Sequence, residues 1–109
     1  MTDYVQVSTA TPLREQAVEL AQGAIKGRLA AGTQVIGPVG SVFWHLGEFG
    51  EGTEWRLLLT TTTDRYPQLE QYLLEHHPWD NPELLATPIV RGAQRCLEWI
   101  DSSVSTEHS

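Results

Sequence analysis

The stretch QVIGPVGSVFWHLGEFGEGTEWRLLLTTTT, residues 34–63, decides the fold of this chain. Residues 34–46 and residues 55–63 are rich in β-branched, aromatic or other apolar residues, so each segment is predicted to be a strand. The polar, glycine-rich segment 47–52 between them is predicted to be the turn. The glycines and the proline in 37–40 predict a bulge or bend in the first strand. The whole stretch is therefore expected to form one long hairpin.

The length of this hairpin predicts self-association. Its arms of about 10 residues or more exceed the usual strand of about 5–6, so the tip is expected to project beyond a core that only two or three short helices cover. A projecting hairpin has unpaired edges and apolar surface, which proteins normally cover with a partner. Its aromatic residues are Phe43, Trp44, Phe49 and Trp55. We therefore expect a closed homo-oligomer.

A strand and a helix are predicted before the hairpin. Residues 4–7 are β-prone, and Thr11 followed by Pro12 is typical of a helix N-cap and first helical position. Apolar residues then recur at three- and four-residue spacing, which predicts an amphipathic helix of about 16 residues. Gly23 and Gly27 each weaken a helix by about 1 kcal/mol relative to alanine, and are expected here to permit close packing on the sheet.

A helix, a strand and a final helix are predicted after the hairpin. Asp64 is expected to cap the first of these helices, which ends at His77 because the residue before a proline is pushed out of the helical region. Residues 83–89 predict a short strand and residues 93–102 a last helix, with Cys96 on its inner face. The predicted class is α+β, a ferredoxin-like βαββαβ sandwich with one extra C-terminal helix.

Length and composition bound the remaining possibilities. The 109 residues suit one domain, 1–109, with a frayed polar tail at 103–109. The single cysteine excludes an intramolecular disulfide and is expected to be a buried, inert thiol in a reducing, cytoplasmic setting. Neither a signal peptide nor a membrane span is recognisable, so no membrane partner is expected. The net charge of -7, with scattered basic residues, argues against nucleic acid as a partner.

Short motifs occur in order along nearly the whole chain. The most specific is the block His76-His77-Pro78-Trp79-Asp80-Asn81-Pro82-Glu83. The others are Arg28-Leu29-Ala30-Ala31, Ser41-Val42-Phe43, Glu54, Thr61-Thr62, Tyr66 with Leu69, Pro88-Ile89 and Leu97-Glu98-Trp99-Ile100. In this order they resemble the CutA (divalent-cation tolerance) family. The resemblance implies a ferredoxin-like protomer in a tight homotrimer whose hairpins pair between neighbours, and a bacterial-type ion-tolerance role, especially toward copper.

Several positions depart from the family pattern. Gly32 stands where the family commonly has a cysteine, so one soft copper ligand is missing. The other departures are Phe43-Trp44-His45, Thr60 and Trp79. In the family these positions lie near the cleft between subunits, so the resemblance implies a pocket with altered side chains on the same fold.

The first functional hypothesis is a trimer that binds a divalent cation or a small ligand in the clefts between subunits. Metal candidates are His76, His77 and Asp80, with copper or zinc as the possible ion, because imidazole and carboxylate suit both. Adjacent histidines on a helix point about 100° apart, so one is expected to be a ligand and the other a helix cap. The predicted ligand-binding residues are Phe43, Trp44, Thr60, Trp79 and Glu83.

The second hypothesis is a small-molecule, biosynthetic enzyme that uses the same clefts. Here His45 acts as general acid or base, and Glu54 on the facing strand orients it. The alternative for His45 is a histidine packed at the interface with its ring nitrogens satisfied.

Overall fold

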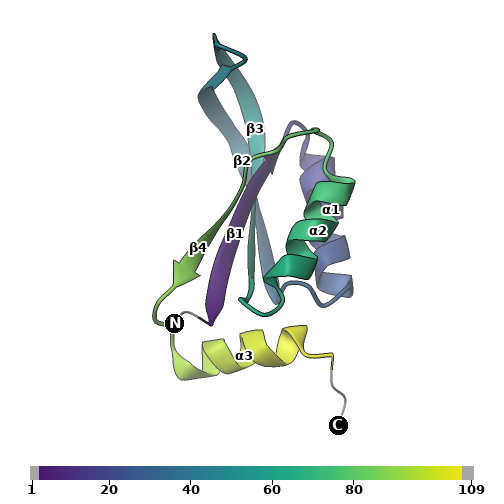
Figure 1. Cartoon of the computed structure of the whole chain (residues 1–109), viewed down its shortest axis with the longest axis vertical. Helices are drawn as coiled ribbons and strands as arrows, with labels where there is room; N and C mark the ends of the chain where they lie inside the picture. Colours follow the sequence, from purple (N-terminus) through teal and green to yellow (C-terminus); the bar gives the residue numbers. More distant parts are fainter. Residues whose placement is uncertain (1–2, 107–109) are drawn as a thin grey trace.

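The computed structural model describes residues 3–106 and contains the predicted order of strands and helices. The elements are β1 (Tyr4–Thr11), α1 (Arg14–Lys26), β2 (Gly32–His45), β3 (Glu48–Thr62), α2 (Tyr66–His76), β4 (Leu84–Ile89) and α3 (Gln94–Val104). The strands form one antiparallel sheet in the order β2-β3-β1-β4, the ferredoxin-like arrangement, with α3 added at the end of the chain (Figure 1). The predicted fold class is confirmed.

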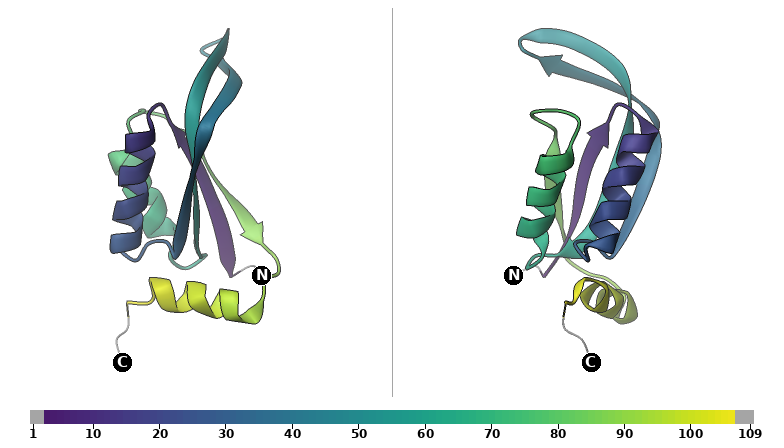
Figure 2. Two further views of the ribbon diagram at one scale, coloured as in Figure 1. Left: turned by 180° about the vertical axis from the view of Figure 1, so that it is seen from behind. Right: turned by 90° about the vertical axis from the view of Figure 1, so that its right-hand side faces the viewer.

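Helices α1 and α2 cover one face of the sheet (Figure 2). Alternate strand residues point toward them, and Val7, Leu57 and Leu59 are fully buried there. The buried stripes of the two helices consist of Ala17, Leu20, Ala21 and Ala24 in α1 and Leu69 and Leu73 in α2. Helix α3 lies across one end of the sheet (Figure 1), where Ile100 and Val104 are buried. One core therefore lies between the sheet and two helices.

The hairpin projects from this core, as predicted. Strand β1 stops pairing with β3 at Trp55, so β2 and β3 pair only with each other over residues 39–54, which we call the arm. The arm extends the molecule to 51 × 25 × 22 Å and rises from the end of the sheet opposite α3 (Figure 1). A register shift between Ile36 and Val39 is the predicted bulge.

The turn of the hairpin is shorter than predicted. Only Leu46 and Gly47 connect the strands, and both have positive φ, at 52° and 80°. The predicted turn over 47–52 is wrong because Gly50 and Gly52 belong to β3. Gly50 lies opposite Phe43, and a Cβ at Gly50 would come within 2.5 Å of the Phe43 ring. This glycine therefore makes room for an aromatic side chain across the ladder.

Both predicted helix caps are wrong by one or two residues. Thr11 is the last residue of β1, and its hydroxyl donates to the Leu13 carbonyl at 2.8 Å, so α1 begins only at Arg14 and has 13 residues. In α2 the N-cap is Arg65 rather than Asp64, and the Arg65 N–H donates to Thr62 Oγ1 at 3.2 Å. In each case a threonine at the end of a strand organises the connection, and in α1 the Gln16 side chain also accepts the Leu13 N–H at 3.2 Å.

Three smaller expectations also change. Helix α3 runs to the buried Val104, so the polar tail does not begin at residue 103 as predicted; residues 107–109 lie outside the described part. Cys96 is exposed on α3, not buried. Gly23 makes room for Tyr72 of α2, not for the sheet, and the Tyr72 hydroxyl donates to the Leu20 carbonyl at 3.1 Å. None of the described helices is long and apolar enough to span a membrane.

Candidate functional site

The two sides of the arm differ in what they carry. Side chains of β3 at odd positions, such as Leu57, point toward the helices, and even positions, such as Arg56, point to the opposite face of the sheet. Phe43 pairs with Gly50 and so shares the side of Arg56, whereas Trp44 pairs with Phe49 on the other side. The arm therefore has a Phe43 side and a Phe49 side.

A groove of about 680 Å³ lies along the Phe43 side of the arm. The arm curls over the end of α2 and the loop that follows it (Figure 2, right), and this loop supplies the facing wall. The lining residues are Ser41, Phe43, Trp44, His45 and Glu54 from the arm, Trp79, Asp80, Asn81 and Glu83 from the loop, and Ala10 and Arg56 from the sheet. Most of the predicted site residues thus meet in one cavity.

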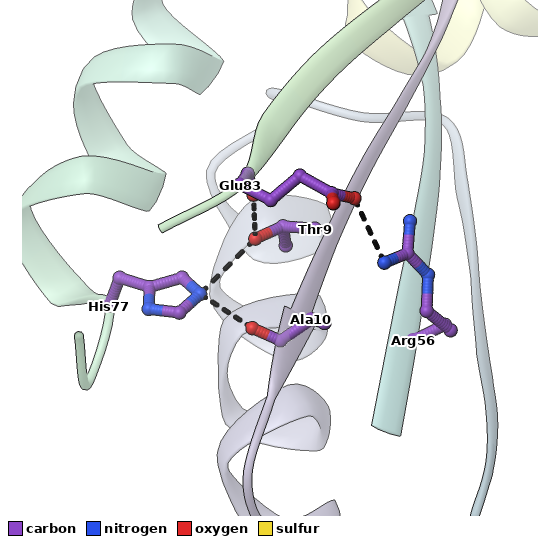
Figure 3. Close-up of polar contacts among 5 residues, drawn as sticks. All are labelled: Thr9, Ala10, Arg56, His77 and Glu83. Carbon is purple, nitrogen blue, oxygen red and sulfur yellow. Dashed lines mark hydrogen bonds and ion pairs between the residues drawn. The ribbon is translucent and has the colours of Figure 1, made fainter. Parts of the chain in front are cut away.

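The groove is acidic overall. Glu54, Asp80 and Glu83 bring three carboxylates, against one guanidinium on Arg56. Arg56 Nη1 lies 2.9 Å from Glu83 Oε1, so this pair is mutually neutralised (Figure 3). Glu54 and Asp80 form no salt bridge with any residue in 3–106. The free charge of the groove is therefore negative.

His77 attaches the loop of the groove to strand β1. Its Nε2 lies 2.8 Å from the Ala10 carbonyl and 3.1 Å from Thr9 Oγ1, and the Thr9 hydroxyl donates to the Glu83 carbonyl at 2.7 Å (Figure 3). On the other side of the ring, Nδ1 accepts the Trp79 N–H at 3.0 Å. Because a backbone N–H can only donate, Nδ1 carries no proton, and Nε2 donates to Ala10. His77 therefore holds Trp79 and Glu83 in place.

Burial favours the neutral form of this ring. The pKa of His77 is lowered from its ordinary value because desolvation penalises the imidazolium, and the hydrogen bond to the Ala10 carbonyl opposes this only in part. A protonated ring would also lose the bond from Trp79, since Nδ1 could no longer accept. The hydrogen bond from Trp79 therefore requires neutral His77, whereas the bond to the Ala10 carbonyl needs only the Nε2 proton, which both forms of the ring carry.

The structure does not join the predicted metal ligands into one site. Both ring nitrogens of His77 are used within the protomer, so assigning His77 as a metal ligand conflicts with its hydrogen bonds. His76 lies exposed at the end of α2, with Nδ1 2.9 Å from the Tyr72 carbonyl, and Asp80 lies in the groove. Within residues 3–106, no group of three or more His, Cys, Asp or Glu side chains is placed to hold a metal ion.

Two other predicted site residues are placed differently from expectation. Thr60 lies in a separate hollow with Gly32 and Trp99, at the end of the sheet near α3. His45 and Glu54 both line the groove, but His45 pairs with Glu48 across the ladder. Glu54 pairs with Val39, six positions away, which is roughly 20 Å along an extended strand. Within one chain, Glu54 is therefore not opposite His45, and its role in orienting His45 stays a prediction.

Sequence reasoning missed Arg56 as a site residue. A usable signal was present, because Arg56 alternates with two buried leucines, Leu57 and Leu59, and so had to face the opposite side of the sheet. Its partner Glu83 was predicted to bind ligand, whereas in the protomer it pairs with Arg56. Only the register of β1 with β3, which sets Ala10 against Arg56, shows that this position reaches the groove.

Comparison with known proteins gives consistent results. A family model described as CutA1 divalent ion tolerance protein matches residues 5–103. The divalent-cation tolerance protein CutA of Thermus thermophilus is 33% identical over 94 residues, which are 86% of this chain and 91% of that protein. The crystal structure of CutA1 from Oryza sativa superposes with a TM-score of 0.91 at 27% identity, covering 97% of each chain. The structure of the periplasmic divalent cation tolerance protein CutA from Archaeoglobus fulgidus superposes with a TM-score of 0.90 at 26% identity, covering 94% of this chain and 99% of that one.

Proposed function

This chain belongs to the CutA1 divalent ion tolerance family, and on that basis we propose that it acts in divalent-cation tolerance as a homotrimer that binds a cation or small ligand in the groove. The observation that carries the proposal is that one cavity collects Phe43, Trp44, Trp79, Asp80 and Glu83, which the sequence marked as a binding site. Those residues come from two segments about 35 positions apart, and the arm brings them together.

Self-association follows from the surface of the arm. Val42, Trp44, Leu46 and Phe49 are 69, 78, 91 and 60% exposed in the single chain. Phe49 shares the side of the sheet that the helices cover farther down, and it lies beyond Trp55, the last residue of β3 that pairs with β1. A patch of this kind is typical of a surface that another subunit buries. Homotrimerisation supplies that subunit and brings three grooves close to neighbouring chains.

A divalent cation would be held by donors from more than one chain. The protomer places Asp80, Glu54 and His45 along the groove and His76 at the nearby end of α2, without grouping three of them. Copper and zinc accept this mixture of imidazole and carboxylate donors. In the proposed trimer a neighbouring chain completes the set, and His77 serves only to position the loop.

Metal titration tests this assignment. We expect metal-free protein at pH 7 to bind Cu²⁺ or Zn²⁺ at least tenfold more tightly than the variants Asp80→Asn and His76→Ala, as measured by isothermal titration calorimetry. Glu51→Gln, a charge change on the arm outside the groove, is the matched control and should leave the affinity unchanged. Equal affinities in the wild type and both site variants would refute the metal assignment.

The role in the cell is tested separately by growth. Cells that lack the gene should stop growing at lower Cu²⁺ or Zn²⁺ concentrations than cells that carry it, and the wild-type gene should restore tolerance. Growth of both strains to the same metal concentration would exclude the tolerance role. A cytoplasmic location stays a prediction, which fractionation would check, and relatives such as the rice protein show that the family is not confined to bacteria.

A further inference from the structure

The walls of the groove combine aromatic rings with carboxylates. Phe43, Trp44 and Trp79 all line it, and each keeps more than a third of its surface exposed in the protomer. The faces of aromatic rings carry negative electrostatic potential and attract cations, most strongly in tryptophan. This wall therefore suits a ligand that is both apolar and positively charged.

The charges in the groove also favour a positively charged ligand. The Arg56 guanidinium is already paired with Glu83 at 2.9 Å, so it offers little to an anionic ligand. Glu54 and Asp80 line the groove without a salt-bridge partner among residues 3–106. An anion such as a nucleotide would meet repulsion from both carboxylates, whereas a cation would gain from both.

The size of the groove separates an organic cation from a bare metal ion. A volume of about 680 Å³ is that of a small-molecule site rather than a coordination sphere. Within one chain, no three donors among the described residues converge on a point, as an inner-sphere metal ion requires. Sulfur ligands are absent from its lining, so nothing in it favours a soft metal.

From these observations we infer that the groove binds an organic cation, an ammonium or guanidinium group carried on a flat or apolar body. Its charged end lies toward Glu54 and Asp80, and its body lies against Phe43 and Trp79. This inference deepens the proposed function, because it rests on the same groove and names the class of small ligand that the groove accepts.

A series of probes that differ only in charge tests the inference. 2-Phenylethylammonium, 2-phenylethanol and phenylacetate share one aromatic body and carry a positive, a neutral and a negative group. We expect the ammonium compound to bind at least tenfold more tightly than the alcohol, and phenylacetate to bind more weakly than both. Tryptophan fluorescence and calorimetry on the wild-type protein measure the three affinities.

Variants test whether residues of the groove cause the preference for the ammonium compound over the alcohol. Glu54→Gln with Asp80→Asn should bring the ammonium-to-alcohol affinity ratio down to about one while keeping the affinity for the alcohol. Trp79→Ala should weaken both compounds, and Glu51→Gln should change neither. Equal binding of ammonium and alcohol by the wild type, no binding of either, or a ratio that survives the double variant would each overturn the inference.

These outcomes are distinguishable from failure of the proposed function. Growth under metal stress and sedimentation test tolerance and assembly, and neither depends on the organic probe. A trimer that confers tolerance but does not discriminate the probes would refute only the ligand class. Discrimination by a chain without any tolerance role would leave the ligand class intact.

Discussion

Replacing His77 with alanine is expected to lower the free energy of unfolding by about 2–4 kcal/mol. The substitution removes the donor to the Ala10 carbonyl and the acceptor of the Trp79 N–H, at 2.8 and 3.0 Å. Each polar group left without a partner costs about 1–3 kcal/mol, toward the low end here because the site is only partly buried. Chemical denaturation at a fixed protein concentration measures the loss, since an oligomer's apparent stability depends on concentration.

Two matched variants keep this expectation specific. His76→Ala removes a neighbouring exposed imidazole whose Nδ1 contacts only the Tyr72 carbonyl, and it should cost less than about 1 kcal/mol. His77→Gln retains a donor for Ala10 and should recover part of the loss. If His76→Ala destabilised the protein as much as His77→Ala, the hydrogen bonds that His77 makes to β1 and to Trp79 would not explain the loss of stability.

The same residue predicts how stability depends on pH. Burial lowers the pKa of His77 below its ordinary value of 6.5, so between the folded pKa and 6.5 the unfolded chain binds more protons than the folded chain. The contribution of neutral His77 is therefore fully present above pH 6.5 and is lost as the pH falls through the folded pKa. Unfolding free energies measured from pH 8 to pH 5 should fall more steeply for the wild type than for His77→Gln. Parallel curves for the wild type and His77→Gln would contradict the prediction.

Replacing Phe49 with glutamate is expected to dissociate the homotrimer. Burying a phenylalanine side chain contributes about 1.5–3 kcal/mol, and a trimer contains three copies, so the overall association constant should fall by about 10³- to 10⁶-fold. A buried, unpaired carboxylate adds to this loss. Sedimentation velocity at micromolar concentration should show the mass of three chains for the wild type and that of one chain for the variant.

The control carries the same charge change at an exposed apolar position away from the arm. Ile25, in the last turn of α1 near α3, is 40% exposed, and Ile25→Glu should leave the trimer intact. Because Phe49 does not line the groove, the probe affinities also report whether one chain suffices for binding. A wild-type protein that sediments as a monomer would remove the proposed assembly altogether.

Local patterns were enough for most of the fold. The period of apolar residues identified α1, and the residue before Pro78 identified the end of α2 at His77, where the backbone becomes extended. Turn chemistry was harder to interpret, because Gly50 and Gly52 look like loop residues until the strand opposite them is known. The helix starts failed for a related reason, since Thr11 and Thr62 bond to the connecting segments instead of acting as simple caps.

The candidate site, like the fold, could be predicted only in part from the sequence. The amino-acid sequence by itself determined an α+β sandwich, an overlong hairpin with an apolar surface, and a group of aromatic and acidic residues suited to binding, because periodicity, propensity and side-chain chemistry are properties of neighbouring residues. Only the tertiary structure decided that both ring nitrogens of His77 form hydrogen bonds within the protein, that Arg56 neutralises Glu83, and that Glu54 lies far from His45 along the ladder. The bonds of His77 to Ala10 and Thr9 and the Arg56–Glu83 ion pair join residues separated by 27 to 68 positions, and strand register and the curl of the arm set their distances.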